Sequence, residues 1–485
     1  MRKTLEVVDQ DVLRQAAARC RERNVVIPTL QQMKHPDLVP ARIRERLLEV
    51  GLWDIDPVNL FRITWKNDPQ SGLYNEGNWV EFPSELTGVS ARIIGIVGKY
   101  FPTGAHKVGA AFGCLVPRLV TGAFDPVSQK AVWPSTGNYC RGGAFDSRLL
   151  GCKSVAILPE EMSRERFEWL AEVADEVIAT PGCESNVKEI YDKCWEIKRT
   201  RPECVVFNQF EEWGNVRWHY HLTGGIVEEI HNAVVAEGQR FAGWISATGS
   251  AGTLAAGDYL KERFPGSLIA AVEALQCPTL LSFGFGGHRI EGIGDKHVPW
   301  IHNVRNTDAV IAVDDQQPMD LLRLFNEPAG RETLREAGVD ASLIEQLDLL
   351  GISSLCNLAA AIKTARYYDM DGRDILYLPL TDSLELYGSR LEELNATHGA
   401  YGRDDAQRHY ARWLQGCTPD HMRELGYAER KQLHNFKYFT WVEQQQRDVN
   451  DLRRLWDRDF WPEMYAEAEL WDEAIGRFNE MVGLG

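Results

Sequence analysis

Between residue 92 and about residue 390, short apolar runs rich in β-branched residues alternate with longer helical segments. The alternation predicts an α/β fold whose mainly parallel sheets are covered by helices on both faces, with ligands at the carboxyl ends of the strands. The predicted strands are Arg92–Val97, Lys130–Trp133, Ser154–Leu158, Glu176–Ala179, Val205–Asn208, Gly243–Ala247, Leu268–Glu273, Ala309–Val313 and Ile375–Leu380. The predicted helices between them are Val108–Leu119, Ala144–Leu150, Arg164–Ala174, Ser185–Thr200, His221–Val235, Thr253–Arg263, Met319–Asn326 and Leu355–Tyr368.

The segments on either side of this central part follow other patterns. Asp11–Glu22 and Ala41–Val50 have helical spacing, whereas Trp53–Leu86 is rich in Trp, Asn, Gly and Pro, and we expect it to be ordered coil. After about Ser389 the pattern predicts no further strand, and Gln407–Met481 is expected to form successive helices. The tryptophans of this tail require burial, either at an intersubunit or interdomain surface or as a single-chain cap over the mouth of an active site.

Composition limits the kinds of partner and the cellular compartment that we expect for this chain. The 485 residues carry a formal net charge of −17, which argues against nucleic acid or an anionic membrane as a general partner. The ten cysteines show no paired CxxC spacing, the first residues lack an apolar signal core, and no apolar run is long enough to span a bilayer. We therefore expect a cytoplasmic protein with reduced thiols.

The stretch Phe101–Gly109 is the first candidate for chemistry. It follows a predicted strand and precedes an Ala- and Gly-rich helix, so Lys107 falls on a strand-to-helix turn facing a crevice. Burial among apolar and small residues lowers the pKa of a lysine and frees its amine as a nucleophile toward a carbonyl. The pattern therefore favours Schiff-base chemistry at Lys107, although a lone lysine at a helix start is more often a surface residue.

Three further turns also follow predicted strands. Pro134–Tyr139 offers hydroxyls, an amide and a glycine, a combination suited to binding anions and hydroxyls. Ala247–Thr253 consists of small residues before a helix, where backbone N–H groups can close around a phosphate. Leu380–Ser383 ends the last strand with hydroxyls that could face a ring nitrogen or cap a helix. Together, the four turns provide an amine, a phosphate site and polar groups for a ring.

In their order and chemistry these turns resemble the fold-type-II pyridoxal-phosphate enzymes, the tryptophan synthase β-family, and within it the cysteine synthase and cystathionine β-synthase branch. The resemblance runs from Arg92 to Tyr387, and further stretches that support it are Asn208–Phe210 followed by His219–Gly225, His288–Gly294 and Gly351–Ser354. It implies two doubly wound, mainly parallel three-layer domains over residues 91–390. The smaller subdomain would cover about 120–215 and the larger one the remainder. Residues 1–90 and 391–485 would be helical extensions.

The resemblance also implies roles for individual residues. Lys107 would form the internal aldimine with pyridoxal 5′-phosphate. Asn138 would bind the cofactor's 3′-oxygen, Ser383 would face the pyridine nitrogen, and the phosphate would lie on the turn made of Gly249, Ser250, Ala251, Gly252 and Thr253. The substrate carboxylate would be held by Ser135, Thr136 and Gln209. Tyr139 stands where the branch has a small residue, so we expect a different preference for the substrate side chain.

The implied function is cysteine-synthase-like β-replacement on an amino acid with a β-leaving group, through an aminoacrylate, in a homodimer. A β-elimination lyase or dehydratase acting on a serine-, cysteine- or threonine-like substrate is the alternative. A cofactor-free scaffold is a remote alternative. A metal hydrolase using His219 and His221 is a further alternative, which their spacing disfavours because it does not place two histidines on one helix face. We expect no metal.

Overall fold

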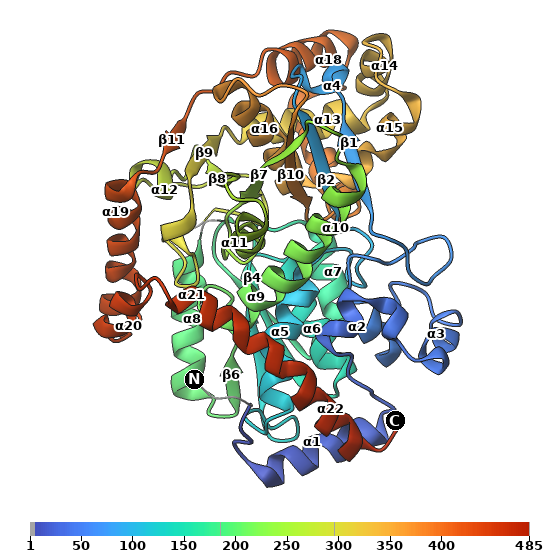
Figure 1. Ribbon diagram of the computed structural model, residues 1–485, viewed down its shortest axis with the longest axis vertical. Coiled ribbons are helices and arrows are strands. Elements are labelled where there is room, and N and C mark those ends of the chain that lie inside the picture. Colours follow the sequence, from blue (N-terminus) through green and yellow to red (C-terminus); the bar gives the residue numbers. More distant parts are fainter. Residues whose placement is uncertain (1–4, 185, 295, 485) are drawn as a thin grey trace.

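The chain folds around two β-sheets (Figure 1). The computed structural model describes residues 5–184, 186–294 and 296–484. The larger sheet has the order β1-β2-β10-β7-β8-β9-β11 and the smaller one β5-β4-β3-β6. Strands β2, β10, β7, β8 and β9 run parallel, as do all strands of the smaller sheet, which confirms the predicted mainly parallel α/β fold. The strands are β1 (Trp79–Phe82), β2 (Arg92–Val97), β3 (Lys130–Pro134), β4 (Lys153–Pro159), β5 (Glu176–Thr180), β6 (Cys204–Val206), β7 (Arg240–Ala247), β8 (Leu268–Ala274), β9 (Ala309–Val313), β10 (Asp374–Leu380) and β11 (Met422–Glu424).

Each of the nine predicted strands forms, but two strands were not predicted. The expectation of coil is wrong at β1, and the expectation that strands stop after Ser389 is wrong at β11. Both are short edge strands that pair antiparallel, β1 with β2 and β11 with β9. Three or four residues carry too little alternation to be recognised, and these two strands exist because a long neighbouring strand offers unpaired backbone groups.

Helices cover both faces of the larger sheet. On β2, Ile94 and Ile96 face one way, toward α10 (Gly224–Val234) and α11 (Leu254–Arg263), whereas Ile93 faces the opposite way, toward α13 (Gln316–Asn326) and α16 (Ile352–Tyr367). This alternation of side chains puts one apolar layer on each side of the sheet. The larger sheet is therefore the middle layer of three.

The smaller sheet has the same construction. On one face, Trp133 and Leu158 belong to the apolar cluster that includes residues of α5 (Lys107–Leu119), α6 (Asn138–Leu149) and α7 (Arg164–Val173). On the other face, Val132 and Ile157 pack against α8 (Val187–Thr200). Ser185, the first residue of the predicted helix there, lies outside the described residues. The division of the chain at residues 90 and 390, and of the core at about 120 and 215, remains a prediction.

The flanking segments wrap around these layers. The first segment contributes α1 (Gln10–Glu22) and α3 (Ala41–Leu47), close to the predicted helices, and the last one runs as a strap from β11 through α19 (Tyr427–Lys437) to α22 (Trp471–Val482) (Figure 1). The remaining helices are α2 (Leu30–Lys34), α4 (Ser84–Thr87), α9 (Trp213–Trp218), α12 (Thr279–Ser282), α14 (Pro328–Glu336), α15 (Ala341–Gln346), α17 (Gly388–His398), α18 (Arg403–His409), α20 (Val449–Arg454) and α21 (Phe460–Ala466). Among the described residues, no helix combines the length and the apolar character needed to cross a membrane.

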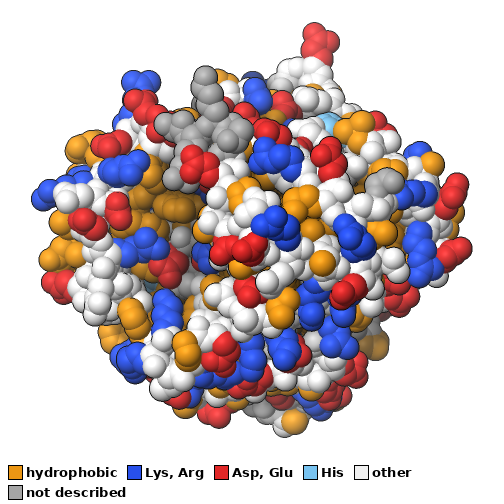
Figure 2. All heavy atoms as spheres, turned by 90° about the horizontal axis from the view of Figure 1, so that it is seen from below, with side chains coloured by type: hydrophobic (Ala, Val, Ile, Leu, Met, Phe, Trp, Pro, Cys, Tyr) orange, Lys and Arg blue, Asp and Glu red, His pale blue; other side chains and the backbone are white. Residues whose placement is uncertain are grey.

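Most of the tail tryptophans are buried within this chain, and Trp456 is partly buried. Trp441, Trp461 and Trp471 are each less than 5% exposed, and Trp471 lies in the core cluster that includes α5 and α6. The position of Trp471 follows from Gly113 on α5, where an added Cβ would lie 3.2 Å from the Trp471 ring. The tail therefore buries these three side chains without a second subunit, whereas Tyr427 and Phe439 on the same tail are exposed. Acidic and basic side chains are interspersed over the face shown in Figure 2.

Truncation of Trp471 tests this packing. We expect Trp471→Ala to lower the free energy of unfolding by about 3–5 kcal/mol, because it empties a large buried volume between α22 and α5. Urea unfolding followed by tryptophan fluorescence and circular dichroism measures the change. The matched control is Trp53→Ala, at a side chain that is 47% exposed, which should shift the unfolding free energy by less than about 0.5 kcal/mol. Equal effects of the two substitutions would contradict the proposed burial.

Candidate functional site

The carboxyl ends of β2, β3, β7 and β10 meet around one small, enclosed cavity. The four turns singled out in the sequence each contribute to it, and Gln209 from the segment after β6 joins them. The residues that line the cavity are Lys107, Ser135, Thr136, Asn138, Tyr139, Glu184, Gln209, Phe210, Gly249, Ser250, Gly292, Ile293 and Thr381. The structure thus brings together Lys107, Asn138, Gly249, Ser250, Ser135, Thr136 and Gln209. Ala251, Gly252, Thr253 and Ser383 do not belong to this lining.

Lys107 is the first residue of α5 and points across the cavity. Its Nζ donates a hydrogen bond to Ser250 Oγ at 3.3 Å, which joins the turn after β2 to the turn after β7. His106 and His219 lie behind it with ring centroids 5.0 Å apart. Burial lowers the pKa of both imidazoles well below the ordinary value, and the Lys107 charge lowers them further. Both rings are therefore neutral at physiological pH.

The turn after β7 requires glycine at two positions. A Cβ at Gly249 would lie 2.9 Å from the Gly292 carbonyl oxygen, and a Cβ at Gly252 would lie 2.1 Å from Asn215 Oδ1. Asn215 in turn donates from Nδ2 to Ser250 Oγ at 2.9 Å. The hydroxyl of Thr253 hydrogen-bonds with Ser246 Oγ on β7 at 2.7 Å, and Thr253 does not line the cavity. Small residues thus let the backbone approach whatever occupies the cavity.

Asn138 is the first residue of α6 and is held by a carboxylate. Its Nδ2 donates to Asp382 Oδ2 at 2.6 Å, and Tyr387 Oη donates to the same oxygen at 2.8 Å. Arg166 on α7 lies 3.5 Å from that oxygen and forms an ion pair with Glu291. The Nδ2 group of the amide is thus held by Asp382. The Oδ1 atom of Asn138 has no hydrogen-bond partner among the described residues.

The turn after β10 places a different hydroxyl at the cavity from the one predicted. Thr381 lines the cavity, and its Oγ1 lies 3.4 Å from His106 Nε2. Ser383, two residues later, is 1% exposed and starts a short 3₁₀ turn outside the lining. The role predicted for Ser383 remains a prediction, while the hydroxyl on the cavity wall belongs to Thr381 of the same motif.

Glu184 is a lining residue that the sequence analysis missed. It is 1% exposed and lies four residues after β5, at the same edge of the smaller sheet as Ser135 and Thr136. Burial raises the pKa of its carboxyl well above the ordinary value, while hydrogen bonding to Thr136 opposes the shift. The rule that ligands gather at the carboxyl ends of parallel strands could have found it, since β5 was predicted.

The two histidines considered for a metal site have separate partners. His219 Nδ1 hydrogen-bonds with the Thr223 hydroxyl at 2.8 Å, and His221 Nε2 lies 3.0 Å from the Tyr465 carbonyl oxygen. Within the ranges that the structure describes, no group of three or more His, Cys, Asp or Glu side chains is arranged to hold a metal ion.

The cavity fits a phosphate-bearing aromatic aldehyde. A lysine amine faces it from one side and a turn of small residues from the other, at the start of α11, where backbone N–H groups favour an anion. In the described part of the chain, Asn138 Oδ1, Asn215 Oδ1 and Glu184 Oε2 are buried without a hydrogen-bond partner. Buried polar atoms are normally satisfied, so such atoms around one cavity indicate a polar ligand.

Comparisons with known proteins agree with this fit. The family model "Pyridoxal-phosphate dependent enzyme" matches residues 99–338. A probable cysteine synthase of Bacillus subtilis is 28% identical over 271 residues, covering 56% of this chain and 80% of that protein. A cysteine synthase of Staphylococcus aureus is 30% identical over 267 residues, covering 55% of this chain and 78% of that protein.

A solved structure supports the same fold. The O-acetylserine dependent cystathionine β-synthase of Helicobacter pylori superposes with a TM-score of 0.54 at 22% identity, covering 64% of this chain and 94% of that one. At this identity the match establishes the architecture alone. Taken with the sequence relatives and the family model, it places the chain among the pyridoxal-phosphate dependent enzymes of fold type II, and the protein belongs to the branch of that family that contains the cysteine synthases.

Proposed function

We propose that the protein catalyses β-replacement: it takes an amino acid with a leaving group on its β-carbon and exchanges that group for a nucleophile. The observation that carries the proposal is the shared cavity, in which Lys107 faces Ser250 on one side and the polar turn Ser135–Asn138 on another. The cysteine synthase relatives support the same reaction type.

In this proposal each turn has one task. Lys107 holds the cofactor covalently, and the backbone of Gly249–Thr253 binds its phosphate. Asn138 binds the ring oxygen, and the hydroxyls of the turn after β10, on Ser383 or Thr381, serve the ring nitrogen. Ser135, Thr136 and Gln209 bind the substrate carboxylate.

Pyridoxal phosphate, when bound, supplies an electron sink that makes the substrate α-proton acidic. The amine of Lys107 then takes that α-proton and returns it at the end of the reaction. The neutral His106 and His219 leave Lys107 as the base that faces the cavity. Asn138, fixed by Asp382, orients the ring with an amide that has no freedom to rotate.

Whether replacement or elimination follows depends on what reaches the β-carbon. Ser135, Thr136, Asn138 and Gln209 are each less than 9% exposed, so water has little access to the reacting atoms. Exclusion of water favours the addition of a selected nucleophile over hydrolysis to a keto acid and ammonia. A β-elimination lyase remains the second candidate. A cofactor-free scaffold is disfavoured because the lysine, the glycine turn and Asn138 all face one cavity.

We also propose that the protein is a homodimer and is located in the cytoplasm. Trp441, Trp461 and Trp471 are already buried in their own chain, so a dimer would not depend on covering these three side chains. Light scattering on the full chain tests the homodimer, and a monomer at micromolar concentration would contradict it.

Removal of the lysine amine tests the cofactor assignment. We expect purified wild type to be yellow and Lys107→Ala to lose this chromophore, because no other described amine lines the cavity. Incubation of the wild type with O-acetylserine, serine, cysteine, threonine and phosphoserine, followed by visible spectroscopy, should show which one reacts. A colourless wild type that does not bind added cofactor would contradict the assignment, and a spectrum unmoved by all five would contradict the substrate class.

Removal of the Asp382 carboxylate tests the orientation of Asn138. We expect Asp382→Ala to keep the chromophore but to lower kcat by about ten-fold or more, since a charge-assisted hydrogen bond of about 1.5–3 kcal/mol is lost. Steady-state kinetics with the accepted substrate measures the change. The matched control is Asp371→Ala, at an exposed residue paired with Arg373 before the start of the same strand, which should retain wild-type kcat. An unchanged kcat in Asp382→Ala would show that Asn138 does not depend on this carboxylate.

A further inference from the structure

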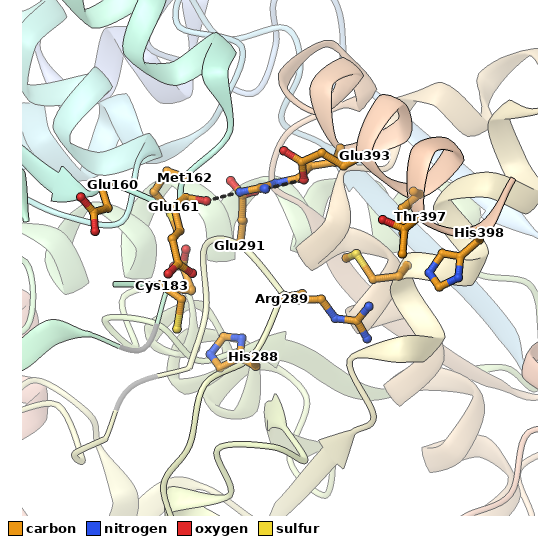
Figure 3. Close-up of a pocket in the computed structure, with 14 residues that line it drawn as sticks. Glu160, Glu161, Met162, Cys183, His288, Arg289, Glu291, Glu393, Thr397 and His398 are labelled. Carbon is orange, nitrogen blue, oxygen red and sulfur yellow. Dashed lines mark hydrogen bonds and ion pairs between the residues drawn. The ribbon is translucent and has the colours of Figure 1, made fainter. Parts of the chain in front are cut away.

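A second, larger cavity of about 590 Å³ lies next to the candidate active site (Figure 3). Its walls come from Glu160–Met162 after β4, Cys183 and Glu184 after β5, His288–Glu291, and Glu393–His398 at the end of α17. It is open to solvent on one side, and it is large enough for a molecule of several non-hydrogen atoms.

Glu184 belongs to the walls of both cavities. It lines the small one with Lys107 and the large one with Glu160, and the consecutive residues Glu291 and Gly292 line the large and the small one respectively. The wall between the two cavities is therefore one residue thick at these places. A ligand in the large cavity would lie directly against the site where the substrate carboxylate is expected.

The charges around the large cavity are predominantly acidic. Arg390 is paired with Glu291 and Glu393, and Arg289 is paired with Asp315. By contrast, Glu160 and Glu161 form no ion pair with any described residue and stand at the rim beside Cys183 (Figure 3). The cations are thus neutralised by their own partners, and the remaining field favours a cation and opposes an anion such as hydrosulfide.

Among the described side chains His288, Glu291 and Glu184 in the cavity wall, only Glu184 has a polar atom without a partner. His288 accepts a hydrogen bond from the Ile290 N–H on Nδ1 and uses Nε2 for the Gly294 carbonyl oxygen at 3.3 Å. Glu291 is occupied by Arg390 and Arg166. Glu184 Oε2 is buried and has no hydrogen-bond partner among the described residues.

We propose that this cavity binds the second substrate of the replacement reaction, that this substrate is a nucleophile carrying a positive charge, and that Glu184 selects it by contact with that charge. The inference rests on the proposed β-replacement and adds to it the class of nucleophile. The nucleophilic end enters the small cavity, and the cationic end stays in the large one, against Glu184 and within the field of the rim carboxylates Glu160 and Glu161.

The state of Glu184 suits this role. Burial raises the pKa of its carboxyl well above the ordinary value, which favours the neutral acid beside the substrate carboxylate. A cation brought against it favours the ionised form and gains a charge-assisted contact. The preference for a cation therefore arises where the second substrate meets the first.

Three thiols that differ in charge test the proposal on the holoenzyme: thiocholine, which is cationic, 2-mercaptoethanol, which is neutral, and 3-mercaptopropionate, which is anionic. With O-acetylserine as first substrate, we expect kcat/KM to be highest for thiocholine. Glu184→Gln should lower the ratio of thiocholine to 2-mercaptoethanol by about ten-fold, because the attraction between the carboxylate and the trimethylammonium group is lost. The spectral change on adding O-acetylserine alone, measured in the same variant, separates an effect on the first substrate from an effect on thiol selection.

Calorimetric titration of the holoenzyme with choline gives a second readout without turnover. We expect Glu184→Gln to weaken choline binding by about ten-fold, whereas Glu168→Gln, the same change at an exposed residue of α7, should leave both readouts unchanged. Retention of the cofactor chromophore shows that each variant is folded.

The outcomes separate the two proposals. If O-acetylserine and the other amino acids leave the wild-type spectrum unchanged, the proposal of β-replacement is wrong. Choline binding that depends on Glu184 would in that case still establish the cation site. An unchanged thiol ratio and unchanged choline binding in Glu184→Gln would overturn the cation site, as would a preference of the wild type for 3-mercaptopropionate.

Discussion

One buried ion pair connects the parts of the molecule that form the active site. Arg166 on α7 of the smaller sheet is fully buried and reaches Glu291, in the loop beside the larger sheet, together with Asp382 and Tyr387 after β10. Burial opposes its charge, but Tyr387, Glu291 and Asp382 outweigh this and raise the pKa of its guanidinium. A buried charge without its partners would cost several kcal/mol, so these elements are stable only when held together. The turn after β10 is thus fixed by this guanidinium, and the turn after β3 is fixed with it, since Asn138 donates to the same Asp382 carboxylate.

The apolar pattern was sufficient to locate the main strands. Arg92–Val97 and Ala309–Val313 have the predicted bounds because a strand buried on both faces is a continuous apolar run that ends where burial ends. The edge strands β1 and β11 could not be found in this way, since their existence depends on pairing with a neighbour that is distant in sequence. The same limit explains why the burial of Trp471 against α5 was left open.

The candidate site was predictable where chemistry and strand ends coincide. Lys107, Asn138 and Ser250 were recognised because an amine, an amide and a hydroxyl each followed a predicted strand, and the structure gathers all three. The sequence could not show which hydroxyl after β10 reaches the cavity. That depends on the path of the backbone from Thr381 to Ser383, which only the structure gives. Glu184 was missed because its only signal in the sequence is its position after the predicted strand β5, and its burial became known only from the structure.

The hydrogen bonds between the segment around α1 and the helix α22 have a consequence for how the chain is made. Arg21 on α1 donates to the Val482 carbonyl oxygen, and Asn479 on α22 exchanges hydrogen bonds with the backbone of Ile27. During synthesis, the segment that carries α1 emerges well before the one that carries α22, since Arg21 and Val482 are 461 positions apart. The part of α1 that α22 covers therefore stays exposed until that later segment has been translated, and this interval is when a chaperone that shields exposed helices would have the most to protect.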